Sequence, residues 1–221
     1  MRMQKIILFL ICALAYPVNC ISANDSETQW QCRNGAFAGR QDDLHLAKVT
    51  GPQQINFCVD FSNSGPPCTF SITSQPGLLP GDRVLINKLK DGWACVYKDL
   101  DTSGWIREST LTLLSVDKKP AIKAWVGKWH DHDTGNMITL KATRDGKRLL
   151  AAGEAIYKNP YQYHTGSFTS TAAPAGNKLQ MNDEDCSVQM TLVADRLVVS
   201  DNNECGGMNV RFDGVYTKRR H

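Results

Sequence analysis

The stretch MITLKATRDGKRLLAAGEAIY (residues 137–157) decides the fold class of this chain. Asp145-Gly146 is a preferred pair for a two-residue type I′ turn, and the runs on both sides of it alternate. Centring a hairpin on this turn pairs three inward positions of each strand: Ala142 with Leu149, Leu140 with Ala151, and Ile138 with Gly153. One face of the hairpin is therefore apolar and tapers to small residues, as the inside of a narrow β-barrel requires.

A second hairpin is predicted in CSVQMTLVADRLVVSDNNEC (residues 186–205), with its turn at Ala194-Asp195. Its inward face carries apolar side chains from both strands: Val188, Met190, Leu192, Leu197 and Val199. In this register Cys186 falls opposite Asn203, two residues before Cys205. A disulfide between Cys186 and Cys205 is therefore geometrically natural.

Strand-like runs continue through the C-terminal half of the chain and are joined mostly by short turns. They lie near residues 126–130, 136–142, 148–157, 164–171, 177–182, 186–193, 196–201 and 207–217. Eight such strands predict an up-and-down barrel, which we assign to residues 121–217. The class predicted for the whole chain is all-β.

Two apolar motifs open and close this barrel: a Trp-x-Gly-x-Trp motif at residues 125–129 and a Phe-x-Gly-x-Tyr motif at residues 212–216. Both are similar to motifs of small lipocalin-like barrels, a resemblance that implies that the first and last strands meet. With VVSDNNECGGMNVRFDGVY (residues 199–217) at its end, the domain resembles a recurrent domain of uncharacterised exported proteins of Gram-negative bacteria. That resemblance implies no chemistry.

The N-terminal half contains LLPGDRVLINKLKDGWACVYKDLDTSGWIRESTLTLL (residues 78–114), which is predicted to be a meander of strands. It resembles the bacterial SH3 domain through three short motifs, Gly81-Asp82-Arg83-Val84, Gly92-Trp93 and Gly104-Trp105-Ile106. The resemblance implies a small SH3-like barrel. We assign it to residues 24–117, with an N-terminal extension, and place the domain boundary at residues 117–120.

Residues 1–23 have the pattern of an export signal. Arg2 and Lys5 form a basic head, residues 6–15 an apolar run, and residues 21–23 a small-residue cleavage site. No later run approaches the roughly 20 apolar residues of a membrane span. We expect a mature chain without a transmembrane segment, periplasmic or secreted.

Six cysteines follow the signal: Cys32, Cys58, Cys68, Cys95, Cys186 and Cys205. An even number in an exported chain predicts disulfides, although six cysteines allow 15 connectivities. We expect the four that precede residue 117 to pair with one another. None of the six lies in a Cys-x-x-Cys motif, which argues against a zinc ribbon or a redox centre.

Charge argues against nucleic acid as a partner. Without Arg2 and Lys5 the chain keeps a net charge of about +1. Nucleic-acid binding needs a concentrated basic patch, which the sequence does not contain outside its last residues.

Two stretches imitate metal sites. Asp99, Asp101 and Ser103 match the start of an EF-hand loop, but Thr110 stands where the bidentate acid belongs. His130 and His132 lie at the end of a predicted strand, where two ligands at most converge. We interpret both stretches as polar turns and expect neither a metal nor a cofactor.

The sequence contains no Gly-x-Ser-x-Gly, His-Glu-x-x-His or phosphate-binding glycine loop, so we expect a protein that is not an enzyme. An acidic turn, Asp183-Glu184-Asp185, has no spacing typical of acid/base catalysis. The SH3 resemblance implies binding of peptidoglycan or a peptide, through a groove rimmed by Trp93, Trp105 and Tyr97 beside Asp101. Trp93 is the more core-like of the two tryptophans.

Two other functions are compatible with the sequence. One is an inhibitor or immunity protein that acts on a cell-wall-degrading toxin or hydrolase of the envelope. The other is a carrier of a small apolar ligand inside the second barrel. Large side chains would fill a barrel of eight strands without a ligand: Leu140, Leu149, Met190 and Leu192.

Overall fold

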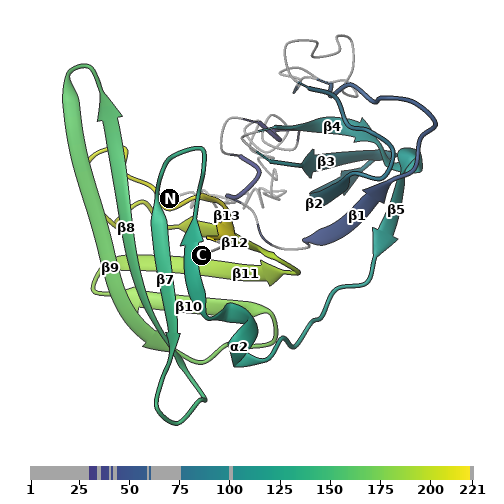
Figure 1. The fold of residues 1–221 in the computed structure, drawn as a ribbon. Coiled ribbons are helices and arrows are strands. Elements are labelled where there is room, and N and C mark those ends of the chain that lie inside the picture. The colour runs from purple at the N-terminus through teal and green to yellow at the C-terminus, as the bar shows by residue number, and fades with distance from the viewer. Residues whose placement is uncertain are drawn as a thin grey trace, which may run out of the picture.

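The computed structural model describes residues 30–33, 36–39, 41, 44–58, 60, 76–99 and 102–219. This part of the chain is all-β, as predicted, and its strands form two separate antiparallel sheets (Figure 1). The predicted signal, Cys68 and Asp101 lie outside the described residues. No described helix is long and apolar enough to cross a membrane.

The first sheet has five strands in the order β4-β3-β2-β1-β5. Their bounds are β1 (His45–Val49), β2 (Arg83–Lys90), β3 (Trp93–Tyr97), β4 (Ser103–Arg107) and β5 (Leu111–Leu114). The short 3-10 helix η1 (Glu108–Thr110) connects β4 to β5. Asp91 and Gly92 both have positive φ, 50° and 76°, which suits the tight turn between β2 and β3.

The second sheet is a nearly closed barrel of eight strands in the order β10-β11-β12-β13-β6-β7-β8-β9. Its strands are β6 (Gly127–His130), β7 (Met137–Ala142), β8 (Leu149–Asn159), β9 (Gln162–Ala172), β10 (Lys178–Asp183), β11 (Cys186–Val193), β12 (Arg196–Asp201) and β13 (Gly214–Lys218). β6 pairs with β13, so the first and last strands of the barrel meet. The wall between β9 and β10 is bridged by hydrogen bonds from Thr169 N to Asp183 Oδ2 (2.7 Å) and from Ser170 Oγ to Asn182 O (2.7 Å).

Both predicted hairpin registers are confirmed, but the turn at Asp145-Gly146 is not type I′, because only Gly146 has positive φ (67°) and Gly146 N donates to Thr143 O at 2.9 Å. Ala142 pairs with Leu149 across the Asp145-Gly146 turn, and Leu192 pairs with Leu197 across the Ala194-Asp195 turn. The last strand is shorter than predicted, because β13 begins at Gly214 and not near residue 207. Side-chain bonds hold the preceding segment as a loop: Asp201 Oδ2 accepts from Phe212 N at 2.5 Å and Asp213 Oδ1 accepts from Asp201 N at 2.8 Å.

The interior of the barrel is a packed apolar core. Its largest fully buried side chains are Trp125, Trp129, Ile138, Leu140, Phe168, Phe212 and Tyr216. The four side chains expected to fill the barrel are also fully or almost fully buried there: Leu140, Leu149, Met190 and Leu192. The short helix α2 (Ile122–Trp125) leads into β6, and its Trp125 lies in this core.

A segment before β1 lies between the two sheets. Its residues share one buried cluster with the first sheet and with Val193, Val198 and Val215 of the second. Gln41 is also buried there, where its amide donates to Ser200 Oγ (3.0 Å) and accepts from Thr191 Oγ1 (2.7 Å). The two sheets are thus joined through an apolar layer as well as through the chain.

Candidate recognition surface

The tryptophan expected at an exposed groove is in the core. Trp105 is 0% exposed, and its Nε1–H donates to the carbonyl of Trp30 at 2.8 Å. The ring of Trp30 meets that of Trp105 edge to face, with centroids 5.0 Å apart. The prediction of an exposed Trp105 is therefore wrong, because the chain's own N-terminal segment covers this face of the sheet.

The two other predicted groove residues are also buried. Trp93 is 4% exposed, as its core-like character suggested, and the Arg107 guanidinium lies 3.9 Å from the centre of its ring. Tyr97 packs against Phe37 with ring centroids 5.4 Å apart, and its hydroxyl donates to Asp133 Oδ2 at 3.2 Å. Trp93 and Trp105 therefore offer no exposed ring, whereas Tyr97 lines a pocket of about 260 Å³ together with Phe37 and with residues of the second half of the chain that include Asp131 and Val215.

The disulfide predicted between Cys186 and Cys205 is confirmed. A second disulfide joins Cys32 to Cys95 and so fastens the N-terminal segment to β3. Cys58 is disulfide-bonded as well. The pairing of Cys32 with Cys95 agrees with the expectation that cysteines before residue 117 pair among themselves.

The segment after β6 is a polar turn. His130 and His132 lie on one side of the chain with ring centroids 4.7 Å apart, and His132 Nε2 is 3.1 Å from Thr217 Oγ1. Asp131 is buried and accepts hydrogen bonds from Asp133 N (3.1 Å) and Thr134 Oγ1 (2.6 Å). Asp131 and Asp133 line the same pocket of about 260 Å³, Asp131 as a buried and Asp133 as an exposed residue.

Burial raises the pKa of Asp131, and the hydrogen bonds from Thr134 and Asp133 offset only part of this effect. Burial also raises the pKa of Tyr216, and the nearby Asp131 carboxyl raises it further. Within the described residues no group of three or more His, Cys, Asp or Glu side chains is placed to hold a metal ion. Asp99 is described, but its loop partner Asp101 is not.

Among the described residues, the most exposed large apolar side chain lies on an element that was not predicted as a site. The last residue pair between β7 and β8 is Met137 with Glu154, whereas the ladder of β8 with β9 continues to Asn159 and Gln162. The two strands therefore extend beyond the barrel as a two-stranded ribbon (Figure 1). We call residues 155–166 the arm.

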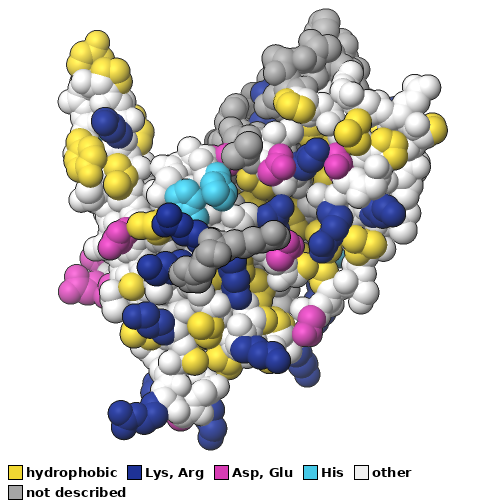
Figure 2. All heavy atoms as spheres, viewed as in Figure 1, with side chains coloured by type: hydrophobic (Ala, Val, Ile, Leu, Met, Phe, Trp, Pro, Cys, Tyr) yellow, Lys and Arg dark blue, Asp and Glu magenta, His cyan; other side chains and the backbone are white. Residues whose placement is uncertain are grey.

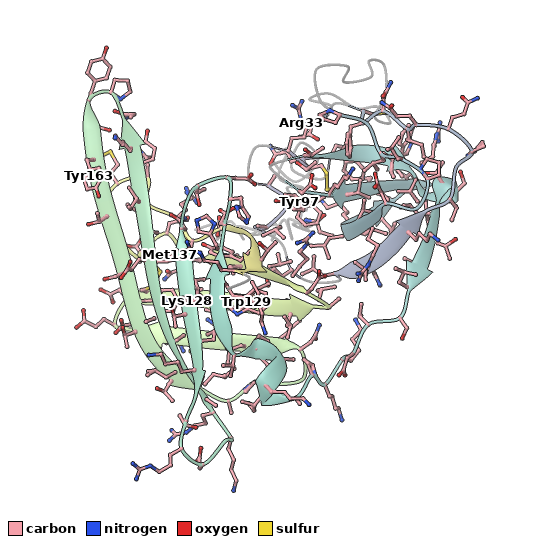
Figure 3. All side chains as sticks on the ribbon, viewed as in Figure 1. Arg33, Tyr97, Lys128, Trp129, Met137 and Tyr163 are labelled. Carbon is pink, nitrogen blue, oxygen red and sulfur yellow. A yellow bond between two sulfur atoms is a disulfide. The ribbon has the colours of Figure 1, made fainter. Side chains whose placement is uncertain are left out.

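The arm carries large apolar side chains in solvent. Tyr161 at its tip is 93% exposed, Tyr163 is 63% exposed and Ile156 is 47% exposed. Figure 2 shows the hydrophobic side chains gathered along the arm, at the upper left of the view. Tyr163 lies on the arm, far from Tyr97 on the five-stranded sheet (Figure 3).

The pairing register divides the arm into two faces. Ile156 pairs with Thr165 and Lys158 pairs with Tyr163, so these four side chains share the outer face. Tyr157 lies on the inner face, where its ring centroid is 6.2 Å from that of His164. The arm is supported at its base by bonds from Gly207 N to Thr165 O (3.2 Å) and from Ile156 N to Asn136 Oδ1 (3.1 Å).

A pocket of about 720 Å³ lies at the base of the arm, beside the Cys186–Cys205 disulfide. Ile156 and Thr165 of the outer face line it. Its other lining residues include five acids: Glu154, Asp183, Glu184, Asp185 and Glu204. Among the described residues that line this pocket there is no Lys, Arg or His. Acidic side chains are visible just below the arm, at the left edge of Figure 2.

The sequence contains one signal for the arm, which is the unequal length of two neighbouring strand runs. The run predicted as the partner of residues 148–157 begins only at residue 136, which would face residue 155, so residues beyond 155 have no counterpart in the preceding strand. In the structure the pairing ends one residue earlier, at Met137 with Glu154. Comparisons of the chain with protein-family models, with curated proteins and with solved structures found no match in any of the three.

Proposed function

We propose that this is an exported, non-enzymatic binding protein that recognises a protein partner of the cell envelope through the arm. The exposure of Tyr161, Tyr163 and Ile156 carries the proposal. Large exposed apolar residues grouped on one element mark interaction sites more often than isolated ones do. Tyrosine in particular offers a large, rigid contact area with one polar end.

Export is supported by the basic and apolar pattern of residues 1–23 and by the disulfides, which persist in oxidising compartments. The strand order β4-β3-β2-β1-β5 is compatible with an SH3-like first domain. The burial of Trp93 and Trp105 nevertheless argues against recognition through the aromatic face of that domain.

Among the functions compatible with the sequence, the exposed side chains of the arm favour an inhibitor of an envelope hydrolase or toxin. A projecting hairpin with exposed aromatic residues at its tip can enter a concave site on a partner. The carrier function has less support, because packed side chains occupy the interior of the barrel.

The test is a comparison of wild-type protein with the double variant Tyr161→Ser/Tyr163→Ser. Proteins captured from envelope extract would be identified and purified, and their affinities measured by calorimetry. Removal of aromatic anchors should weaken binding by about 2 kcal/mol, or roughly 30-fold in Kd. The matched control is Leu113→Ser, which removes a side chain that is 55% exposed on the other sheet.

Equal affinity of the arm variant and the wild type for every purified partner would contradict the proposal. Co-sedimentation with purified peptidoglycan, unchanged by the arm substitutions, would favour the cell wall as the ligand instead. Cleavage of peptidoglycan by the wild-type protein would overturn the non-enzymatic assignment.

A further inference from the structure

The outer face of the arm continues directly into the acidic pocket. Ile156 and Thr165 pair across the ribbon, and both also line the pocket. Tyr163 is on the same face, two residues closer to the tip than Thr165. A partner that packs on Tyr163 and Ile156 therefore reaches the carboxylates of the pocket with its neighbouring side chains.

The five carboxylates are available to an external cation. Asp183 Oδ2 accepts a hydrogen bond from Thr169 N, and Glu154, Glu184, Asp185 and Glu204 are all exposed. In the part of the chain that the structure describes, none of the five forms an ion pair. Carboxylates grouped in one hollow create a local negative potential that attracts cations, although the chain as a whole has a small positive net charge.

From the continuity of this surface and its charge we propose that the partner presents an arginine or lysine side chain, which enters the pocket while its flanking apolar residues pack on the outer face of the arm. The long stem of such a side chain can lie along Ile156 while its charged head meets Glu184 and Glu204. The arm then supplies apolar contact, and the pocket selects a basic surface over an acidic one. This inference rests on the proposed function, since it names the chemistry of the same partner.

The test uses blocked pentapeptides that have alanine at every position except the centre, which holds arginine, lysine, norleucine or glutamate. Each peptide is titrated into the isotopically labelled full chain, and backbone amide signals are followed by NMR. We expect the arginine and lysine peptides to shift the signals of Thr165, Ser167, Glu184, Glu204 and Gly206. The affinity should fall as salt is added.

The double variant Glu184→Gln/Glu204→Gln removes two charges and retains the size of both side chains. It should weaken the arginine peptide about tenfold, which corresponds to roughly 1.4 kcal/mol. Because both residues are exposed, the variant should keep its stability within about 0.5 kcal/mol. The matched control is Glu108→Gln, an exposed acid of the 3-10 helix η1 between β4 and β5, which should leave peptide binding unchanged.

The inference is overturned if the norleucine peptide binds as well as the arginine peptide, if no pocket signal shifts, or if the double variant binds the arginine peptide like the wild type. Zinc and calcium are titrated in parallel, and a metal that produces the same shifts at lower concentration would also overturn it. Failure of the proposed function is a separate result. It is detected with Tyr161→Ser/Tyr163→Ser, which leaves all five carboxylates in place.

Discussion

The indole N–H of Trp105 donates to the backbone carbonyl of Trp30, 2.8 Å away, and the two rings meet edge to face. This pair joins residues 75 positions apart in the chain. Cys32, two residues after Trp30, is bonded to Cys95 on the strand that pairs with β4. The N-terminal segment is thus a structural part of the first sheet and fills the place where a ligand was expected.

Substitution of Trp105 should therefore reduce stability before it affects any binding. We expect Trp105→Ala to lower the free energy of unfolding by about 3–5 kcal/mol, through loss of buried area and the cavity left behind. Trp105→Phe keeps most of the apolar volume but loses the hydrogen bond to Trp30, and should cost less. Urea denaturation followed by circular dichroism measures both. A Trp105→Ala variant that unfolds like the wild type would place this indole outside the core.

Removal of each disulfide should cost stability in proportion to the logarithm of the loop that it closes. The Cys32–Cys95 bond spans 63 residues and the Cys186–Cys205 bond spans 19. In the chain-entropy model the first contributes about 4 kcal/mol and the second about 3 kcal/mol. Paired Cys→Ala variants, compared by denaturation without reductant, test this order. The opposite order would mean that contacts of the N-terminal segment persist without its covalent link.

The raised pKa of Asp131 predicts a definite dependence of stability on pH. A carboxyl with a higher pKa in the fold binds its proton more tightly there than in the unfolded chain. The stabilisation that this tighter proton binding gives to the fold is fully present below the ordinary pKa of 3.8 and is lost as pH rises through the pKa of the folded state. The free energy of unfolding of Asp131→Asn, measured by urea denaturation and expressed relative to the wild type, should therefore be higher at pH 7 than at pH 3.

Asp82 provides a control of opposite sign. Burial alone would raise its pKa, but hydrogen bonds from Lys98 and from the backbone of Leu79 lower it overall. Its stabilising contribution is present at neutral pH and lost as pH falls through the folded pKa. The free energy of unfolding of Asp82→Asn, expressed relative to the wild type, should therefore be lower at pH 7 than at pH 3. If both variants changed with pH in the same direction, the raised pKa of Asp131 would not be the cause of the pH dependence seen for Asp131→Asn.

The hairpins of the barrel were predictable because their register depends on local chemistry. A short connection such as residues 143–148 leaves little freedom in which residues face each other, and alternation then fixes which face is buried. Leu140 and Ala151 are paired and buried for these reasons. The disulfide between Cys186 and Cys205 followed from the same local register.

The place of Trp105 was not predictable in this way, because its burial depends on a segment without periodic pattern. Trp30, Phe37 and Gln41 contribute single side chains from turns and irregular backbone. The exposure of the arm depends on a comparison between strands: β7 has six residues and β8 has eleven. The alternation of apolar and polar residues in one strand predicts which face is buried, but it does not show where the neighbouring strand ends.

The glycine at position 153 should be intolerant of any side chain. Gly153 pairs with Phe168 across β8 and β9, and an added Cβ would overlap Phe168 Cε1 and lie 2.7 Å from Cδ1. The ring cannot move away freely, because it packs edge to face on Phe212 with centroids 4.9 Å apart. Gly153→Ala should therefore destabilise the protein by about 1–3 kcal/mol, as overpacking of a core does.

Two variants separate this overlap from a general effect of replacing glycine. Gly39→Ala adds a Cβ that meets nothing closer than Ala36 O at 3.9 Å, so it should be nearly neutral. In the double variant Gly153→Ala/Phe168→Leu the smaller side chain makes room for the new methyl group. The double variant should then lose less stability than the sum of the two single changes, since the residues share one site. Strict additivity in thermal and urea unfolding would show that the ring over Gly153 is not what requires a glycine there.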